Sequence, residues 1–192
     1  MSFVLAFDSP VGRLAITERD GAIVAIGWGG EPAGEPTALL TEARRQIEAY
    51  FCRRLDRFDL PLKPRGSAHE QRVWAAMRQI PYGETRSYSD LAFAVGSGPR
   101  AVGNACGRNP IPIVIPCHRV LAKNGLGGYS GGKGLPTKRL MLGLEGAVLP
   151  KAAGRKSGAH SATGSGMKAE YASLFRPTPS AVIVSSPTRD AD

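Results

Sequence analysis

The 192-residue sequence has no long apolar run. A membrane-spanning helix needs about twenty consecutive apolar residues, so we expect no membrane association. The N-terminus, MSFVLAFDSPVGR, has no basic region before its apolar stretch, so no secretory signal is predicted either. We therefore expect a cytoplasmic protein, associated with the nucleoid in a bacterium or located in the nucleus of a eukaryote.

Cysteine and histidine are scarce. The three cysteines, Cys52, Cys106 and Cys117, form no close pair, so no disulfide framework is predicted. The three histidines lack zinc-ligand spacing and no Cys-x-x-Cys occurs, so we expect neither a metal nor a cofactor. The sequence leaves one candidate for covalent chemistry, the adjacent pair Cys117-His118.

Acidic residues are fewer than basic ones, 16 against 25, and the net charge is +9. Residues 1–66 hold nine of each sign, residues 67–149 hold ten basic and four acidic side chains, and residues 150–192 hold six and three. All of the excess positive charge therefore follows residue 66. It is compatible with a polyanionic partner such as nucleic acid, but on composition alone a solvated basic face is the commoner explanation.

The first part of the chain has the alternation of an antiparallel sheet. Strands are predicted over 3–7, 13–17 and 22–28. Apolar residues spaced three and four apart predict a helix over 37–54. An alternating segment that contains a proline predicts an edge strand over 58–62.

Residues 67–149 have the pattern of a helical domain. A Ser-x-x-acidic capping box at Ser67, and another at Ser87, each predict the start of a helix. A Gly-Ser-Gly turn before Pro99 predicts a third helix, and the last two helices then form a helix-turn-helix. A final helix is predicted over 136–144.

The predicted fold class is α+β, with a small N-terminal antiparallel sheet and helix before a mostly helical, helix-turn-helix (winged-helix-like) domain. The expected division is a first domain over 1–62, a linker over 63–66 and a second domain over 67–149. The low-complexity basic tail over 150–192 is expected to be disordered.

The third predicted helix, PRAVGNACG (99–107), is rich in small residues. A glycine inside a helix costs roughly 1 kcal/mol relative to alanine, so Gly103 needs a reason. Small side chains let a helix approach a surface such as the walls of a DNA groove, with Arg100 projecting from its start. Alternatively, Gly103 packs against another helix and Arg100 is a surface charge, and the pattern alone slightly favours this alternative.

The segment IPCHRV (115–120) contains the Cys-His pair. The thiolate is the reactive form of cysteine, so a nearby base or cation would activate Cys117. Neighbours on an extended chain point to opposite sides, so His118 is expected to act through a water molecule. The commoner alternative is a buried structural cysteine beside a core histidine. The loop GLGGYSGG (125–132) permits close approach of a ligand, or supplies flexibility alone.

Five segments, in order and spacing, resemble the C-terminal catalytic domain of the O6-alkylguanine-DNA alkyltransferases. They are SYSDLA (87–92), RAVGNA (100–105), NPIPIVIPCHRV (109–120), GGYSGG (127–132) and LEG (144–146). The PCHRV core is highly specific for that family. The resemblance is strong over 67–149, weak over 1–66 and absent from the tail.

The resemblance implies a DNA repair protein that acts by direct reversal, once per molecule. Cys117 would take the alkyl group from the O6 atom of a damaged guanine, with O4-alkylthymine as a second candidate substrate. His118 would serve as its base through a water molecule, held in turn by Glu145. Asn109 would brace the turn before the cysteine, and Tyr88 would donate a hydrogen bond to the guanine ring.

The resemblance also implies a DNA surface. Arg100 would enter the duplex and fill the place of the extruded nucleotide, since a base inside the stack cannot be reached. The predicted DNA-contacting or base-contacting residues are Arg100, Ala101, Gly103, Arg119, Tyr129 and Ser130. The implied partner is double-stranded DNA with an alkylated guanine, bound through its minor groove by a monomer.

Two other functions remain open on the sequence. One is a lesion-binding protein without catalysis. Some relatives have tryptophan at the acceptor position, and Cys117 argues against this reading. The other is a Cys-His hydrolase, which would need an oxyanion hole that nothing beyond the pair indicates.

Overall fold

The computed structural model describes residues 1–148, so the predicted tail over 150–192 lies outside the described residues. The elements are β1 (Ser2–Phe7), β2 (Leu14–Arg19), β3 (Ala22–Trp28), α1 (Ala38–Phe51), α2 (Ala68–Arg78), β4 (Arg86–Ser87), α3 (Tyr88–Ala94), α4 (Pro99–Gly107), the 3₁₀ turn η1 (Cys117–Arg119), β5 (Val120–Leu121) and α5 (Leu135–Leu144). The predicted α+β class is confirmed. No helix within residues 1–148 is long and apolar enough to cross a membrane.

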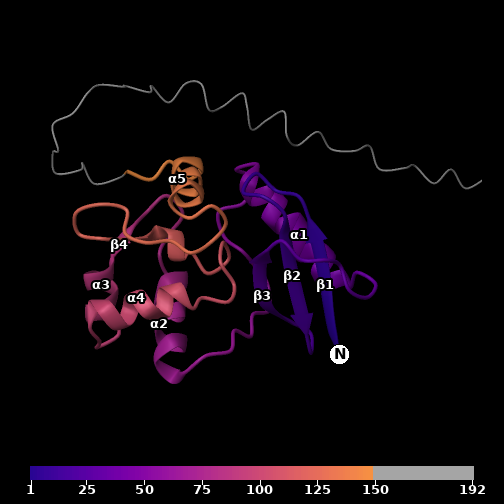
Figure 1. The fold of residues 1–192 in the computed structure, drawn as a ribbon, viewed down its shortest axis with the longest axis horizontal. Coiled ribbons are helices and arrows are strands. Elements are labelled where there is room, and N and C mark those ends of the chain that lie inside the picture. The colour runs from indigo at the N-terminus through magenta and orange to yellow at the C-terminus, as the bar shows by residue number, and fades with distance from the viewer. Residues whose placement is uncertain (149–192) are drawn as a thin grey trace, which may run out of the picture. The chain divides into compact units, whose positions relative to one another are not determined.

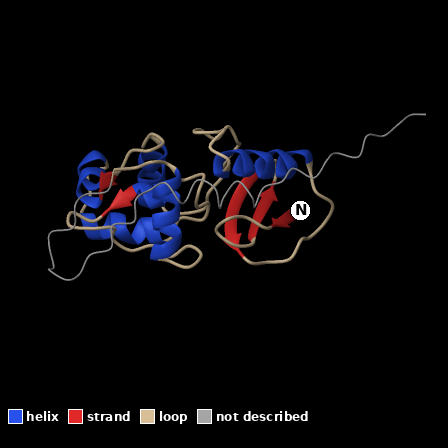
Figure 2. Ribbon diagram, turned by 90° about the horizontal axis from the view of Figure 1, so that it is seen from above, coloured by secondary structure: helices blue, strands red, loops and turns tan. Residues whose placement is uncertain are grey.

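The N-terminal sheet is antiparallel, in the order β1-β2-β3, and α1 covers one face of it (Figures 1 and 2). Leu14 and Ile16 of β2 and Ile47 of α1 are fully buried between the two layers. The side chain of Thr37 caps α1 by accepting from the backbone of Leu40 at 3.1 Å. The helix ends earlier than predicted, and Arg53 just beyond it has a left-handed φ of 57° that a helix cannot continue.

The edge strand predicted over 58–62 is wrong. The segment makes one isolated parallel bridge, between Ile23 and Leu62. Ile23 donates its N–H to the carbonyl of Pro61 at 2.8 Å, and Lys63 donates to the carbonyl of Ile23 at 2.9 Å. Pro61 has no N–H of its own, so the ladder cannot extend along the segment.

The helical predictions for the second part of the chain are confirmed. Capping boxes start α2 at Ser67 and α3 at Ser87, and Pro99 occupies the first turn of α4. Figure 1 shows α2, α3 and α4 together on one side of the sheet-containing part. Trp74 of α2 donates its Nε1–H to the carbonyl of Ala105 at 2.9 Å, which fixes α4 against α2.

A two-stranded parallel sheet, which the sequence did not predict, joins the helices to the Cys-His segment. Arg86 of β4 pairs with Val120 of β5, and Ser87 pairs with Leu121. Each strand has only two residues, too few for a recognisable pattern. The pairing places the start of α3, and with it Tyr88, beside the segment that follows η1.

Candidate active site

The turn that precedes Cys117 is built around Asn109. Its Nδ2 donates to the carbonyl of Ile115 at 2.8 Å, and its Oδ1 accepts from the N–H of Ile111 at 3.1 Å. Between these two points Ile113 has a φ of 75°, an unfavourable conformation for a β-branched residue. Full burial of the Ile113 side chain and the two Asn109 hydrogen bonds hold this strained turn in place.

Cys117 begins the 3₁₀ turn η1 and is buried. Burial raises the pKa of its thiol, while a hydrogen bond from Asn109 and the charge of Lys138 act in the opposite direction. The thiol therefore carries its proton in the resting protein, and the proton must leave when the sulfur attacks.

His118 follows Cys117 in the turn, so the expectation of an extended chain at this pair is wrong. Its Nε2 lies 2.8 Å from Glu145 Oε1, which assigns the Nε2–H to this bond and leaves Nδ1 as the free lone pair. Nδ1 is buried and has no hydrogen-bond partner among residues 1–148. Burial lowers the pKa of His118, so the imidazole is neutral and Nδ1 is able to accept a proton.

Glu145, the C-cap of α5, is the centre of a buried hydrogen-bond network. Its Oε1 accepts from Tyr50 at 2.7 Å as well as from His118, and its Oε2 accepts from the backbone of Gly83 at 3.2 Å. Burial alone raises the pKa of Glu145, but the hydrogen bonds and charges of His118 and Arg119 outweigh it and bring the pKa to about 2. The carboxylate is thus ionised throughout the physiological range.

Arg119 was predicted to contact DNA, and the structure contradicts this prediction. It is only 5% exposed. Its Nε and Nη2 donate to the Glu145 carboxylate at 2.9 Å each, and its Nη1 donates to the carbonyl of Ile80 at 2.6 Å. A guanidinium held by a buried carboxylate cannot reach a phosphate without breaking this ion pair, so Arg119 belongs to the interior network.

Lys138 of α5 is fully buried and also lies near the cysteine. Its Nζ donates to three carbonyls, those of Val120 and Leu126 at 2.6 Å each and that of Gly128 at 3.2 Å. Burial lowers the pKa of Lys138 to about 8, and the neighbouring thiols Cys117 and Cys106 act to raise it. The ammonium is therefore charged at neutral pH and ties the glycine-rich loop to α5.

Tyr88, the first residue of α3, is half-buried between α4 and the glycine-rich loop. A Cβ added at Gly127 would lie 2.9 Å from the Tyr88 ring, so the loop can pass this close only with glycine there. Burial, and then the nearby thiols Cys106 and Cys117, raise the pKa of Tyr88 to about 12. The hydroxyl keeps its proton at neutral pH and can act as a hydrogen-bond donor.

Tyr129 and Ser130 lie in the same loop and differ in exposure. Tyr129 is half-buried, its hydroxyl lies 3.7 Å from Met141 Sδ, and its ring makes an edge-to-face contact with Trp28. Ser130 is exposed. The structure therefore brings Tyr129 against both parts of the chain, while Ser130 faces solvent.

The surface of α4 carries the remaining predicted DNA-contacting residues. Arg100 and Ala101 are exposed, and among residues 1–148 Arg100 has no ion pair and no hydrogen-bond partner. A Cβ at Gly103 would come no closer than 3.9 Å to any atom beyond its own helix, the nearest being in Tyr88. Gly103 therefore faces Tyr88 of α3, as in the alternative weighed above, but a methyl group would fit there, so close packing against that helix does not require a glycine.

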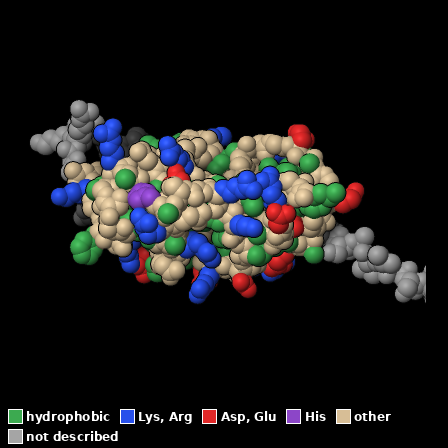
Figure 3. All heavy atoms as spheres, turned by 90° about the horizontal axis from the view of Figure 1, so that it is seen from below, with side chains coloured by type: hydrophobic (Ala, Val, Ile, Leu, Met, Phe, Trp, Pro, Cys, Tyr) green, Lys and Arg blue, Asp and Glu red, His purple; other side chains and the backbone are tan. Residues whose placement is uncertain are grey.

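Charge is distributed unevenly over the described surface. In the view of Figure 3, most of the Asp and Glu side chains lie toward the sheet-containing part, while Lys and Arg dominate toward the helical part. This agrees with the balanced charge of residues 1–66 and the excess of six positive charges over 67–149. A polyanion would accordingly be attracted to the helical part.

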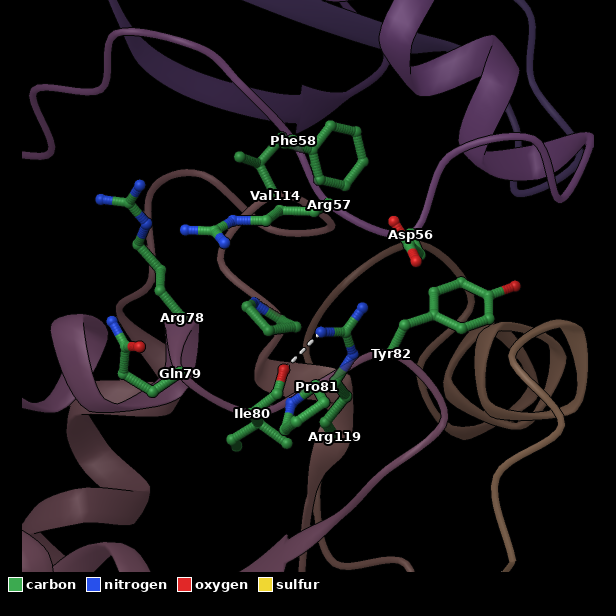
Figure 4. Close-up of a pocket in the computed structure, with 11 residues that line it drawn as sticks. Asp56, Arg57, Phe58, Arg78, Gln79, Ile80, Pro81, Tyr82, Val114 and Arg119 are labelled. Carbon is green, nitrogen blue, oxygen red and sulfur yellow. Dashed lines mark hydrogen bonds between the residues drawn. The ribbon is translucent and has the colours of Figure 1, made fainter.

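A cleft of about 430 Å³ borders the same turn without including Cys117. Pro116 and Arg119 contribute to its wall, and Arg57 and Arg78 place their guanidinium groups on the same side of it (Figure 4). The dashed bond in that view joins Arg119 to Ile80. Because the thiol does not line the cleft, the cleft gives no access to Cys117.

No group of three or more His, Cys, Asp or Glu in the part of the chain that the structure describes could hold a metal ion. All three cysteines are free.

Two family models match this chain: 6-O-methylguanine DNA methyltransferase, ribonuclease-like domain, over residues 5–64, and 6-O-methylguanine DNA methyltransferase, DNA binding domain, over residues 68–147. The constitutive methylated-DNA–protein-cysteine methyltransferase of Bacillus subtilis is 39% identical over 159 residues, which is 76% of this chain and 96% of the relative. The chain belongs to the 6-O-methylguanine DNA methyltransferase family.

Solved structures of this methyltransferase family share the fold. The crystal structure of the Mycobacterium tuberculosis O6-methylguanine methyltransferase is 37% identical, with a TM-score of 0.66 over 76% of this chain and 93% of that one. Mycobacterium tuberculosis OGT in complex with DNA is 40% identical, with a TM-score of 0.65 over 73% and 91%. The family resemblance drawn from the five sequence segments is thereby confirmed.

Sequence reasoning missed three residues of this methyltransferase site, namely Tyr50, Lys138 and Trp28. Lys138 had a detectable signal, because it lies three and four residues before Met141 and Leu142 and thus on the apolar face of α5. Tyr50 and Trp28 carried none, since their contacts cross to the other part of the chain.

Proposed function

We propose that this protein repairs DNA by moving an alkyl group from the O6 atom of guanine to Cys117. It is a methylated-DNA–protein-cysteine methyltransferase, and DNA is its partner. The activity is carried by the named relatives, of which three are 39–42% identical over 151 to 159 residues. The observation that carries the residue assignment is the buried thiol of Cys117 next to a neutral His118 whose Nδ1 has no partner among residues 1–148.

In the proposed reaction the Cys117 sulfur attacks the alkyl carbon in line with the bond to O6. The S–C bond forms as the C–O6 bond breaks, and the electron pair of that bond passes to the guanine. The thiol proton moves through a water molecule to His118 Nδ1 and ends on the released guanine. The product is a thioether with no route back to the thiol, so each molecule acts once.

The buried network is proposed to prepare His118 for this proton. Glu145 is ionised and holds the Nε2–H, so a proton arriving at Nδ1 forms an imidazolium beside a carboxylate. Arg119 lies against the same carboxylate and limits that stabilisation, which lets His118 release the proton again. Tyr88, with its hydroxyl protonated, is proposed to donate to the guanine as negative charge develops on it.

The DNA side of the proposal rests on α4. Arg100 is exposed and unpaired among the described residues. The small side chains of Ala101 and Gly103 allow another surface to approach the helix backbone closely. We propose that α4 enters the minor groove, that Arg100 fills the place of the extruded guanine, and that Tyr129 and Ser130 line the pocket that receives it. Phosphate contacts suit a protein that must act in any sequence context.

The domain division, location and state of the protein are also proposals. Domains over 1–62 and 67–149 with a linker over 63–66 are supported by the two family models, which meet between residues 64 and 68. Three free thiols support a cytoplasmic protein. Action as a monomer is supported because the acceptor Cys117 and the groups proposed to handle its proton, His118 and Glu145, all come from one chain.

Intact-mass measurement with a duplex that contains O6-methylguanine tests the proposal. We expect one added CH₂ group per protein molecule, located on Cys117, and no adduct on Cys52 or Cys106. Cys117→Ser should form no adduct, while Cys106→Ser should still react. A Cys117→Ser protein that still removed the methyl group would refute the assignment, and hydrolysis of an ester over many turnovers would support the hydrolase instead.

A further inference from the structure

The glycine-rich loop over 125–132 is held from the first part of the chain by Trp28, the last residue of β3. The Trp28 Nε1–H donates to the carbonyl of Val11 at 3.0 Å, so the ring is fixed by its own sheet. The ring meets that of Tyr129 at 6.5 Å between centroids and at an angle of 87°. An edge-to-face aromatic contact of this kind is directional and resists displacement of either ring.

At two positions of the loop the Trp28 ring leaves room only for a glycine. A Cβ at Gly131 would lie 2.5 Å from Trp28 Cη2 and 2.8 Å from Tyr129 Cε1. A Cβ at Gly132 would lie 2.8 Å from Trp28 Nε1, and the φ of that residue is 53°. Both distances to Trp28 are shorter than real Cβ contacts, so the loop backbone rests directly on the indole.

The opposite side of the loop is anchored by Lys138, which binds the carbonyls of Leu126 and Gly128. Between these anchors lies Tyr129. The loop therefore has one support from α5 and a second from β3, and loss of the second leaves Tyr129 without a rigid neighbour on that side.

We infer that Trp28 is a positioning and specificity-determining residue for alkyl transfer, because its ring sets how far Tyr129 and the loop can retreat from the alkylated base. The inference rests on the proposed function, in which Tyr129 lines the base pocket. A small alkyl group depends on a narrow pocket to stay aligned with the sulfur, whereas a large one gains from a wider pocket.

The test compares O6-methylguanine and O6-benzylguanine at the same position of one duplex, with the full-length protein and intact mass as the readout. Trp28→Ala is expected to slow methyl transfer about tenfold, as loss of an aromatic support and of alignment predicts. The benzyl-to-methyl rate ratio should rise about fivefold, with benzyl transfer about twofold slower, because the wider pocket penalises the small group more than the large one. Affinity for the undamaged duplex should stay unchanged.

Phe3→Ala is the matched control. Phe3 belongs to the same sheet and also packs its ring against a glycine, with a Cβ at Gly34 falling 2.8 Å from the ring. Phe3 takes no part in the contacts that hold Tyr129 in place. The control should leave the benzyl-to-methyl ratio unchanged even where it lowers the melting temperature.

A second series separates positioning from general stability. Gly131→Ala should slow methyl transfer about tenfold by the same loss of alignment, while Gly128→Ala, which has nothing within 4 Å, should change it little. Trp28→Ala combined with Gly131→Ala should lose less than the product of the two single losses, since removal of the indole leaves the Tyr129 ring as the one ring that the added methyl group still meets.

An unchanged benzyl-to-methyl ratio in Trp28→Ala, or losses that simply multiply in the double variant, would overturn the inference. Failure of the wild-type protein to transfer either group would instead refute the proposed function. Should Trp28→Ala not fold, Trp28→Phe and the pair Gly131→Ala and Gly128→Ala decide the matter, because all three retain a ring at position 28.

Discussion

The interior and the surface of the helical part of the chain handle charge in opposite ways. Inside, Glu145, Arg119 and His118 share hydrogen bonds within 3.2 Å and none is more than 6% exposed. On the surface, Arg100 projects from α4 with no partner among the described residues. A buried charge needs a fixed partner, whereas a DNA-binding charge must stay free until the phosphates or bases arrive.

The two arginines show that sequence position does not reveal which charge is available to DNA. Arg119 directly follows the Cys-His pair and was predicted to contact DNA, but its guanidinium is fully engaged in hydrogen bonds inside the protein. Arg100 has the same side chain with none of these bonds. Substitutions in the interior should therefore affect stability and every substrate, while those on α4 should affect duplex DNA alone.

The largest effect is expected from Glu145→Gln, which leaves Arg119 as a buried charge without a counterion. Loss of one partner of a buried pair costs about 3–5 kcal/mol of unfolding free energy. Transfer to Cys117 should slow about a hundredfold, since His118 loses the group that supports it as a base. Urea unfolding and the transfer rate with free O6-benzylguanine measure the two losses.

The same carboxylate predicts an acid transition. The pKa of Glu145 is about 2 in the folded protein and near 4.5 in the unfolded chain. The unfolded chain thus binds the extra proton between these values, so stability is present above pH 4.5 and is lost as the pH falls toward 2. Urea midpoints recorded from pH 6 to pH 2 should show a steep loss.

Glu42→Gln is the control for the acid transition. Glu42 also has a pKa of about 2, set by hydrogen bonds from Arg45 and Gln46, but it lies at the surface of α1. Solvent screens the Arg45 pair, so the control should leave the acid curve nearly unchanged. An acid curve that Glu42→Gln flattens and Glu145→Gln does not would reverse the contrast between surface and interior.

A smaller and more selective effect is expected from Arg100→Ala. Transfer from a duplex should slow about tenfold, because in the proposed complex Arg100 fills the place of the extruded guanine in the duplex. Transfer from free O6-benzylguanine should stay within about twofold. Arg139→Ala removes the same charge from the exposed side of α5 and should affect neither substrate by much. Equal losses on both substrates in Arg100→Ala would contradict its role at the duplex.

The helices and the three-stranded sheet were predictable because their signals are local. Capping boxes at Ser67 and Ser87 and a proline at residue 99 mark helix starts within a few residues. The strand prediction over 58–62 was wrong because apolar and polar residues alternate there as in a strand, while Pro61 lacks the N–H that a ladder needs. Its one bridge depends on Ile23, far away in sequence.

The site was predictable only in part. The resemblance singled out Cys117, His118 and Glu145, which the structure joins into one region, the last two by a hydrogen bond. It misplaced Arg119, because nothing in CHRV tells whether the arginine turns inward or outward. The direction is set by the 3₁₀ turn and by a carboxylate 26 residues later.

The smallest effect, and the sharpest test of the interior, is Tyr50→Phe. Tyr50 comes from α1 and donates to Glu145 at 2.7 Å, so its loss removes one of several hydrogen bonds to that carboxylate and keeps the ring. A hydrogen bond to a charged group is worth about 1.5–3 kcal/mol, but His118, Arg119 and Gly83 still donate to Glu145. We therefore expect transfer to slow by only about threefold. The loss of transfer rate should be equal for duplex and free base, unlike that of Arg100→Ala.

Tyr82→Phe is the control for Tyr50→Phe, since Tyr82 belongs to the same aromatic cluster but donates to the carbonyl of Leu144. A rate change in Tyr82→Phe as large as in Tyr50→Phe would mean that packing, and not the bond to Glu145, links α1 to the site.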